Sequence, residues 1–168
     1  MTKFNSFIGK VTNISNFRTG IENTEGCYKF ITLQDNNGNI VNFIMTPYTF
    51  LVDYETISVG DIVEGFYDAM APAVMIYPPQ YEAIVMTKVK PNRNVKVDYF
   101  DEQLVSSDGT LRLNIAPNTK ITMQNGQNFT NSITNKNLVV VYGPSTKSIP
   151  AQTTPYEIVV LCRNNQFN

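Results

Sequence analysis

The chain is built of short apolar runs separated by turn residues. Of all its sequence features, this spacing restricts the possible folds most strongly. Lys29–Gln34 and Ile40–Ile44 flank the segment Asp35-Asn-Asn-Gly-Asn39, which is a hairpin signature because Asn and Gly tolerate positive φ. No segment keeps helical periodicity for three turns. Twenty Asn and seventeen Thr fit this pattern, since Asn favours turns and Thr favours strands. The sequence therefore predicts an all-β protein with little helix.

Further strands are expected wherever an apolar run lies between turn residues. These runs are Phe7–Ile14, Thr49–Val52, Asp61–Tyr67, Glu82–Val89, Val95–Phe100, Leu111–Ile115, Lys120–Met123, Leu138–Tyr142 and Glu157–Leu161. The dipeptides Asp108-Gly109 and Asn125-Gly126 predict two more tight turns.

The two halves of the sequence can be aligned with each other. Asn42–Leu51 aligns with Arg112–Ile121 at an offset of 70, which places the two X-Pro-X-Thr segments together. After a five-residue insertion, Tyr67 aligns with Tyr142, and Tyr81–Met86 is expected to align with Tyr156–Leu161. This order predicts two related β-units, residues 1–90 and 91–168, the second ending in a short polar tail.

Each predicted unit has five or six short strands, a number that suits a small closed or partly open barrel. The expected fold is therefore two tandem related β-barrels of the oligonucleotide-binding (OB) type, packed together. The joining segment Lys90-Pro-Asn-Arg-Asn94 is short, which favours a fixed arrangement of the two barrels.

Several segments carry a resemblance to a known group of proteins. They are Phe7–Val11, Ile57–Gly65, Phe66–Asp68, Ile76–Tyr81 and Ile149–Pro155. With these segments the chain resembles uncharacterised clostridial β-barrel repeat proteins, whose repeats also occur beside copper-amine-oxidase-like N-terminal domains in secreted, cell-surface chains. The resemblance implies a β-barrel scaffold and, from the secreted examples, a cell-surface location, and it implies no reaction.

No catalytic pattern is found in the sequence, and we expect no enzyme. The chain has no His, which is the commonest general base and a frequent metal ligand. Carboxylates that could act alone are Asp53, Glu55, Asp61, Glu64, Asp68, Asp98, Asp101 and Glu102, and surface positions are the simpler interpretation. The Asp35 segment lacks the glycine and glutamate spacing of an EF-hand. No catalytic residue, metal site or cofactor is predicted.

Charge argues against nucleic acid as the partner. The formal net charge is −1, so no overall positive field would attract a polyphosphate chain. Cutting after Lys90 gives 6 basic and 9 acidic residues before the cut (−3), and 7 basic and 5 acidic residues after it (+2). The two halves could attract each other weakly in a head-to-tail contact between molecules.

An apolar loop, residues 69–81, is the most unusual segment. Three prolines stiffen it, yet it carries Met70, Val74, Met75, Ile76 and Tyr77. These side chains are expected either to pack on the chain's own second unit or to contact another molecule. The corresponding loop of the second unit, residues 144–155, is polar in sequence.

The cysteines Cys27 and Cys162 are far apart in sequence and form no CxxC pattern. They are expected to be two buried free thiols, or to form a cross-link within one molecule or between neighbours.

Two functions remain open from the sequence. The first is a non-enzymatic structural or interaction protein that associates with itself as an oligomer or fibre at a spore or cell surface. The second is a ligand-binding module of OB type, which would bind a small molecule or single-stranded nucleic acid through strand aromatics. No apolar run reaches the length of a secretory signal or a membrane span, so no membrane insertion is expected, and the chain as written would be cytoplasmic.

Overall fold

The computed structural model describes residues 1–162, and in these residues it contains strands and turns but no α-helix. The one helical element is a short 3-10 turn at Val52–Tyr54. The prediction of an all-β chain is confirmed.

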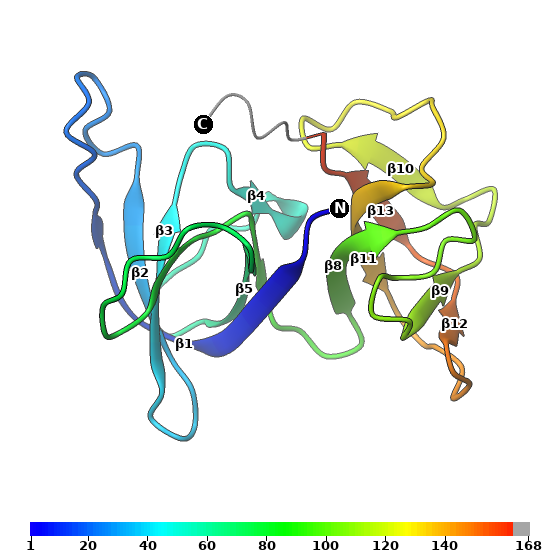
Figure 1. The fold of residues 1–168 in the computed structure, drawn as a ribbon, viewed down its shortest axis with the longest axis horizontal. Coiled ribbons are helices and arrows are strands. Elements are labelled where there is room, and N and C mark those ends of the chain that lie inside the picture. Colours follow the sequence, from blue (N-terminus) through cyan, green and yellow to red (C-terminus); the bar gives the residue numbers. More distant parts are fainter. Residues whose placement is uncertain (163–168) are drawn as a thin grey trace. The chain divides into compact units, whose positions relative to one another are not determined.

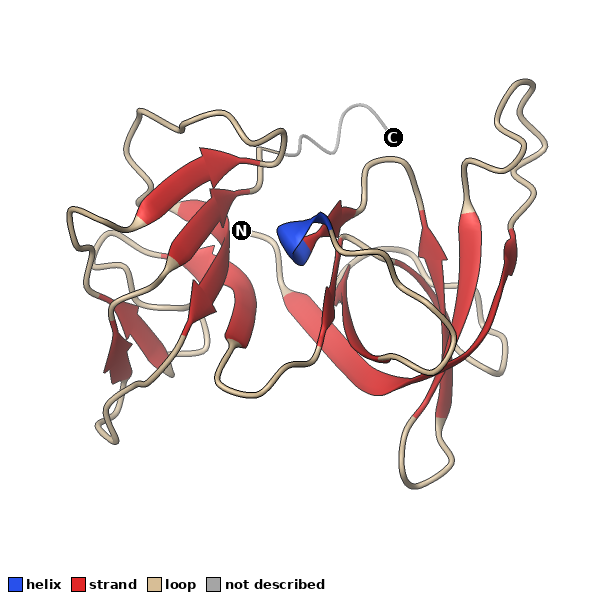
Figure 2. Ribbon diagram, turned by 180° about the vertical axis from the view of Figure 1, so that it is seen from behind, coloured by secondary structure: helices blue, strands red, loops and turns tan. Residues whose placement is uncertain are grey.

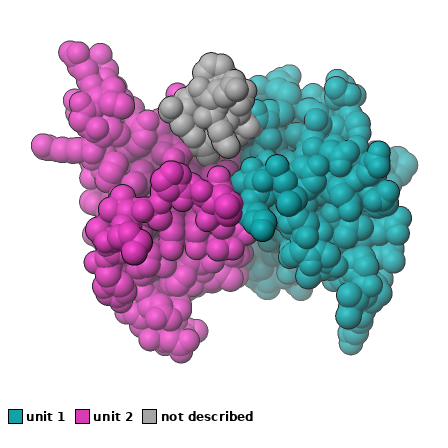
Figure 3. Space-filling view, viewed as in Figure 1, with its two compact units in different colours: residues 1–3, 90–168 teal, residues 4–89 magenta. Residues whose placement is uncertain are grey.

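The chain divides into two compact units (Figure 3). The N-terminal unit contains Phe4–Val89. The C-terminal unit contains Lys90–Asn168, of which residues 163–168 lie outside the described part, together with Met1–Lys3. The first three residues thus belong with the second half of the chain, although the sequence analysis placed them in the first.

A seven-stranded sheet forms the N-terminal unit, in the order β4-β7-β5-β1-β2-β3-β6 (Figure 1). Its strands are β1 (Phe4–Asn16), β2 (Lys29–Gln34), β3 (Ile40–Met45), β4 (Phe50–Leu51), β5 (Ile62–Asp68), β6 (Gln80–Glu82) and β7 (Val85–Lys88). The long strand β1 pairs antiparallel with β5 along residues 4–10 and with β2 along residues 10–16. At the other end of the sheet, β6 pairs parallel with β3, and β7 follows β6 directly and pairs antiparallel with β5.

The C-terminal unit has a four-stranded sheet, β10-β13-β11-β8, and a two-stranded sheet, β12-β9. Its strands are β8 (Asn94–Phe100), β9 (Leu111–Leu113), β10 (Lys120–Met123), β11 (Lys136–Tyr142), β12 (Ala151–Thr153) and β13 (Glu157–Val160). Four of its strand pairings have counterparts in the N-terminal unit. The antiparallel pairs β8–β11 and β11–β13 correspond to β1–β5 and β5–β7. The parallel pairs β10–β13 and β9–β12 correspond to β4–β7 and β3–β6.

One strand lacks a full counterpart. Where the N-terminal unit has β2, the C-terminal unit has only the isolated bridges Phe100–Ser106 and Val105–Arg112. Because these single bridges do not make a strand, the C-terminal pairing is split into two sheets.

The register of the strands corrects the sequence alignment in one place. Phe50 pairs with Val85 in β4–β7, and Lys120 pairs with Glu157 in β10–β13. The residue numbers of Phe50 and Lys120 differ by 70, which is the predicted offset. The residue numbers of Val85 and Glu157 differ by 72, whereas the sequence alignment gave an offset of 75 for this part of the chain. Tyr156 therefore corresponds to Ile84 and not to Tyr81, because the loop of the C-terminal unit is shorter than the gapless alignment assumed.

The shared X-Pro-X-Thr segment has the same hydrogen bonds in both units. Thr49 Oγ1 accepts from the Thr46 amide at 2.9 Å and donates to the Ala83 carbonyl at 2.7 Å. Thr119 Oγ1 accepts from the Ala116 amide at 3.2 Å and donates to the Pro155 carbonyl at 3.1 Å. In each unit this hydroxyl ties the turn before a strand to the neighbouring chain segment.

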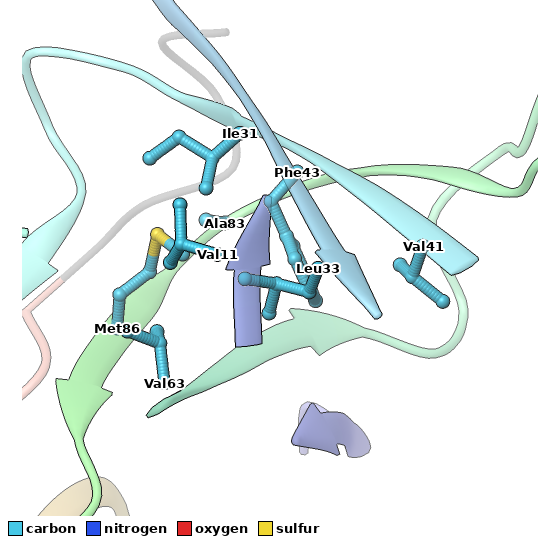
Figure 4. Packing of buried hydrophobic residues seen from close by; sticks show 8 residues of the cluster. All are labelled: Val11, Ile31, Leu33, Val41, Phe43, Val63, Ala83 and Met86. Atoms are coloured by element: carbon cyan, nitrogen blue, oxygen red, sulfur yellow. The ribbon is translucent and has the colours of Figure 1, made fainter. Parts of the chain in front are cut away.

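The core of the N-terminal unit follows the alternation of its strands (Figure 4). Ile31 and Leu33 of β2, and Val41 and Phe43 of β3, point inward, while the residues between them are less buried. Phe43 is fully buried, and a Cβ at Gly65 of β5 would lie 2.7 Å from its ring. Glycine at residue 65 therefore leaves the space that the phenyl ring occupies.

A second core fills the C-terminal unit. Its buried side chains come from four strands and one loop: Phe100, Leu111, Leu113, Ile133, Leu138, Val140, Ile158 and Val160. Each unit thus has a hydrophobic core of its own.

Candidate functional site

The apolar loop of the N-terminal unit connects β5 to β6 and covers residues 69–79. It is shorter than the expected 69–81, because Gln80 and Tyr81 pair with β3 as part of β6. It begins as a turn, because the Asp68 carboxylate accepts from the Met70 amide at 2.8 Å and the Asp68 carbonyl accepts from the Ala71 amide at 3.2 Å. It ends against β3, where the Asn42 amide donates to the Pro79 carbonyl at 2.9 Å. Both ends of the loop are therefore held by the sheet.

All five apolar side chains that the sequence analysis selected are exposed. The exposed fractions are 73% for Met70, 64% for Val74, 99% for Met75, 49% for Ile76 and 81% for Tyr77. A large exposed apolar surface often marks a contact site, and these five side chains lie within eight consecutive residues. The loop is thus the strongest candidate for a binding surface in the part of the chain that the structure describes.

An aromatic cluster lies at the base of this loop. The rings of Tyr67 and Tyr81 stack with centroids 3.8 Å apart and planes 8° apart, and each lies about 6 Å from the buried ring of Phe43. Burial raises the pKa of the Tyr67 hydroxyl, and the hydrogen bond and charge interaction with Tyr81 raise it further. The aromatic residues next to the two ends of the loop therefore pack on the core, whereas the loop side chains are exposed.

The corresponding loop of the C-terminal unit connects β11 to β12. Its turns are held by Thr146, whose amide donates to the Gln152 carbonyl at 2.9 Å, and by Thr153, whose hydroxyl donates to the Pro144 carbonyl at 2.8 Å. This loop is polar as expected, with one exception that the sequence analysis missed. Ile149 is 95% exposed.

The corrected register explains this exposed isoleucine. Pro78 and Pro150 differ by 72, the offset that the paired strands give, and both follow a cis peptide bond. Tyr77 and Ile149 therefore hold the same position in their units, and both are exposed. An alignment that allowed a shorter second loop would have found this pair from the sequence.

Neither cysteine is buried. Cys27 and Cys162 are free and exposed, so the expectation of two buried thiols is wrong, and no disulfide joins them. Cys27 lies in the loop between β1 and β2, where its amide donates to the Thr24 carbonyl at 3.0 Å. Cys162 lies two residues after the end of β13, beyond the buried Leu161, and is exposed. A cross-link between neighbouring molecules stays a prediction.

Three of the candidate carboxylates, Asp61, Asp98 and Glu64, bind backbone or side-chain groups of their own unit. Asp61 accepts from the Ser58 amide at 2.8 Å and pairs with Lys88 at 3.3 Å, and these contacts lower its pKa, although burial opposes them. Asp98 is buried and accepts from the Ser107 hydroxyl at 2.6 Å. Glu64 accepts from the Ser6 hydroxyl at 2.7 Å.

The Asp35 segment forms the expected hairpin turn. The Asp35 carboxylate accepts from the amides of Asn37 and Asn39 at 2.9 Å each, and from the Asn39 side chain at 2.9 Å. The Asn39 side chain lowers the pKa of Asp35 most, against a smaller opposing effect of burial. Within residues 1–162, no group of three or more acidic or thiol side chains is close enough together to hold a metal ion.

A hollow lies inside the loop between β1 and β2. Its volume is about 670 Å³ and its lining runs from Asn16 to Gly26. Beside it the rings of Phe17 and Phe30 stack, with centroids 6.0 Å apart and planes 13° apart. Most other strand aromatics serve the core, since Phe43, Phe50, Phe66 and Phe100 are buried.

Comparison with known proteins does not identify the chain: no family model matches the sequence, and no curated protein matches it. In the described part of the chain, no helix is long and apolar enough to cross a membrane.

Proposed function

We propose that this chain is a non-enzymatic interaction protein made of two related OB-like barrels, and that it associates with itself through the apolar loop of the N-terminal unit. The exposure of the five side chains between Met70 and Tyr77 is the observation that carries this proposal. Burial of one large apolar side chain stabilises a contact by roughly 1.5–3 kcal/mol. Burial of several at once favours a stable interface.

The pairing order supports the OB-like barrel. In the N-terminal unit the pairings run from β1 through β2 and β3 to the segment that contains β6 and β7, and then through β5 back to β1. Figure 2 shows these strands curved around a common interior. A five-stranded barrel of this kind leaves loops free to vary without loss of the scaffold.

The shape of the loop supports a binding role rather than a packing defect. Three prolines restrict its backbone, and the sheet holds both of its ends, so little conformational entropy would be lost when it is buried. The resemblance to clostridial repeats of cell-surface chains adds support for a spore or cell-surface subunit.

Light scattering after size-exclusion chromatography tests this proposal. We expect the average mass of the full chain to rise with protein concentration. The double variant Met75→Ser/Tyr77→Ser removes the two most exposed apolar side chains of the loop and should prevent this rise. Tyr48→Ser is the matched control, because Tyr48 is 70% exposed but lies outside the loop. A wild-type chain that stays monomeric at every concentration would contradict the proposal.

A second candidate function is ligand binding at the loop between β1 and β2. The stacked Phe17 and Phe30, with Arg18 and Lys29 beside them in sequence, offer an aromatic surface and positive charge at a position that OB-fold proteins use for ligands. A gel-shift assay with single-stranded DNA at low salt tests it, with Phe17→Ala as the comparison. No shift with the wild-type chain would remove nucleic acid as the ligand.

A further inference from the structure

Charge is divided unequally between the two units. Within residues 4–89 the basic residues are Lys10, Arg18, Lys29 and Lys88, against nine acidic residues, so the N-terminal unit carries 4 − 9 = −5. The C-terminal unit then has the remaining 13 − 4 = 9 basic residues and 14 − 9 = 5 acidic residues, which gives +4. One of those nine, Arg163, lies outside the described residues.

The structure makes this difference larger than the sequence cut suggested. Lys3 and Lys90 belong to the C-terminal unit, whereas the cut after Lys90 counted both with the first half. The difference between the halves grows from −3 and +2 to −5 and +4 as a result.

The charges of the two corresponding loops differ in the same sense as the charges of their units. The N-terminal loop, residues 69–79, has no charged side chain, and the acidic Asp68 precedes it. The C-terminal loop carries Lys147, which is exposed, two residues before the exposed Ile149. The position that corresponds to Asp68 is Gly143, so the acidic residue is absent there.

The opposite net charges of the two units favour some contacts between two copies of the chain over others. A symmetric contact that joins like units would bring two acidic or two basic surfaces together, which is unfavourable. A contact that joins the N-terminal unit of one copy to the C-terminal unit of the next brings opposite charges together. Such a contact uses different surfaces on the two partners. Growth of the wild-type chain beyond a dimer therefore distinguishes an open head-to-tail chain from a two-fold dimer in which both contacts close.

From this charge distribution we infer that the partner of the apolar loop is a second copy of this chain, bound head to tail. The acidic N-terminal unit, with its loop, binds the basic C-terminal unit of the next molecule. The inference rests on the self-association proposed above and adds its direction. Because the Debye length is about 8 Å at physiological salt, the association weakens as salt is raised.

Two charge-reversal variants of the full chain test the direction. Glu22→Lys/Glu25→Lys changes the N-terminal unit from −5 to −1, and Lys120→Glu/Lys147→Glu changes the C-terminal unit from +4 to 0. All four side chains are exposed, so both variants should fold, as circular dichroism would verify. The neutral variant Glu22→Gln/Glu25→Gln is the matched control and should have an intermediate effect.

Sedimentation velocity gives the decisive comparison. Each reversal variant alone should remain monomeric at a concentration where the wild-type chain associates. An equimolar mixture of the two should form a heterodimer that grows no further, because one intact acidic unit meets one intact basic unit. The inference is overturned if the mixture stays monomeric, or if either variant alone associates as the wild-type chain does. If Met75→Ser/Tyr77→Ser abolishes association while both reversal variants keep it, self-association through the loop stands and only its head-to-tail direction fails.

Discussion

The hydroxyl of Thr49 connects a turn to the strand segment beside it, and its removal should destabilise the N-terminal unit. It accepts from the Thr46 amide at 2.9 Å and donates to the Ala83 carbonyl at 2.7 Å. Thr49→Val keeps the shape of the side chain but leaves both backbone groups without this partner. Thr46 is 9% exposed and Ala83 is fully buried, so water cannot easily replace the hydroxyl.

The expected cost follows from these contacts. A buried polar group left without a partner costs about 1–3 kcal/mol, so the loss of two bonds should lower the free energy of unfolding by roughly 2–4 kcal/mol. The corresponding Thr119→Val should cost less, because its two hydrogen bonds are longer, at 3.2 and 3.1 Å. Thr49→Ser keeps the hydroxyl and should retain most of the stability.

Urea unfolding followed by circular dichroism measures the loss, and hydrogen exchange locates it. The Thr46 amide should exchange faster in Thr49→Val than in Thr49→Ser. A valine variant with an unchanged unfolding midpoint and an unchanged Thr46 exchange rate would refute this reasoning.

Three further predictions concern packing, pH and the thiols. Gly65→Ala should destabilise the chain by about 1–3 kcal/mol in thermal unfolding, because its Cβ meets the buried Phe43 ring at 2.7 Å. Gly143→Ala should cost much less, because its Cβ meets the outer end of the half-exposed Tyr156, which can move. Burial would raise the pKa of Asp108, but hydrogen bonds from Lys96, Ser106 and Thr110 hold it below its ordinary value of 3.8. This stability is present above pH 3.8 and is lost as the pH falls further, so Asp108→Asn should flatten the acid limb of the stability profile. Both cysteines should react with a thiol reagent in the native chain, and a thiol that reacts only after unfolding would contradict their exposure.

Much of the fold could be predicted from the sequence, because local turn chemistry sets most strand ends. Lys29–Gln34 and Lys120–Met123 form strands with the predicted bounds, and the Asp35 hairpin forms as expected. The three-residue strands β6 and β12 were missed. Both pair parallel with distant strands, so long-range pairing rather than local preference makes them strands.

The candidate site was located from the sequence only in part. An apolar run beside three prolines is visible in the sequence, and Met75 and Tyr77 are indeed exposed. Ile149 was missed because residues 144–155 are mostly polar in sequence, and exposure of the single isoleucine among them depends on how the loop is folded. The cysteines were misplaced because proximity to a strand does not determine burial, and Cys27 lies in a loop outside the sheet.

Hydroxyl-radical footprinting at low and high protein concentration tests most directly whether the apolar loop is the contact surface. Met75 is 99% exposed and Tyr77 is 81% exposed, so both should be modified rapidly when the chain is dilute. We predict that both become protected as the average mass rises, while Tyr48 stays reactive. Association that leaves Met75 and Tyr77 as reactive as in the dilute chain would contradict the account.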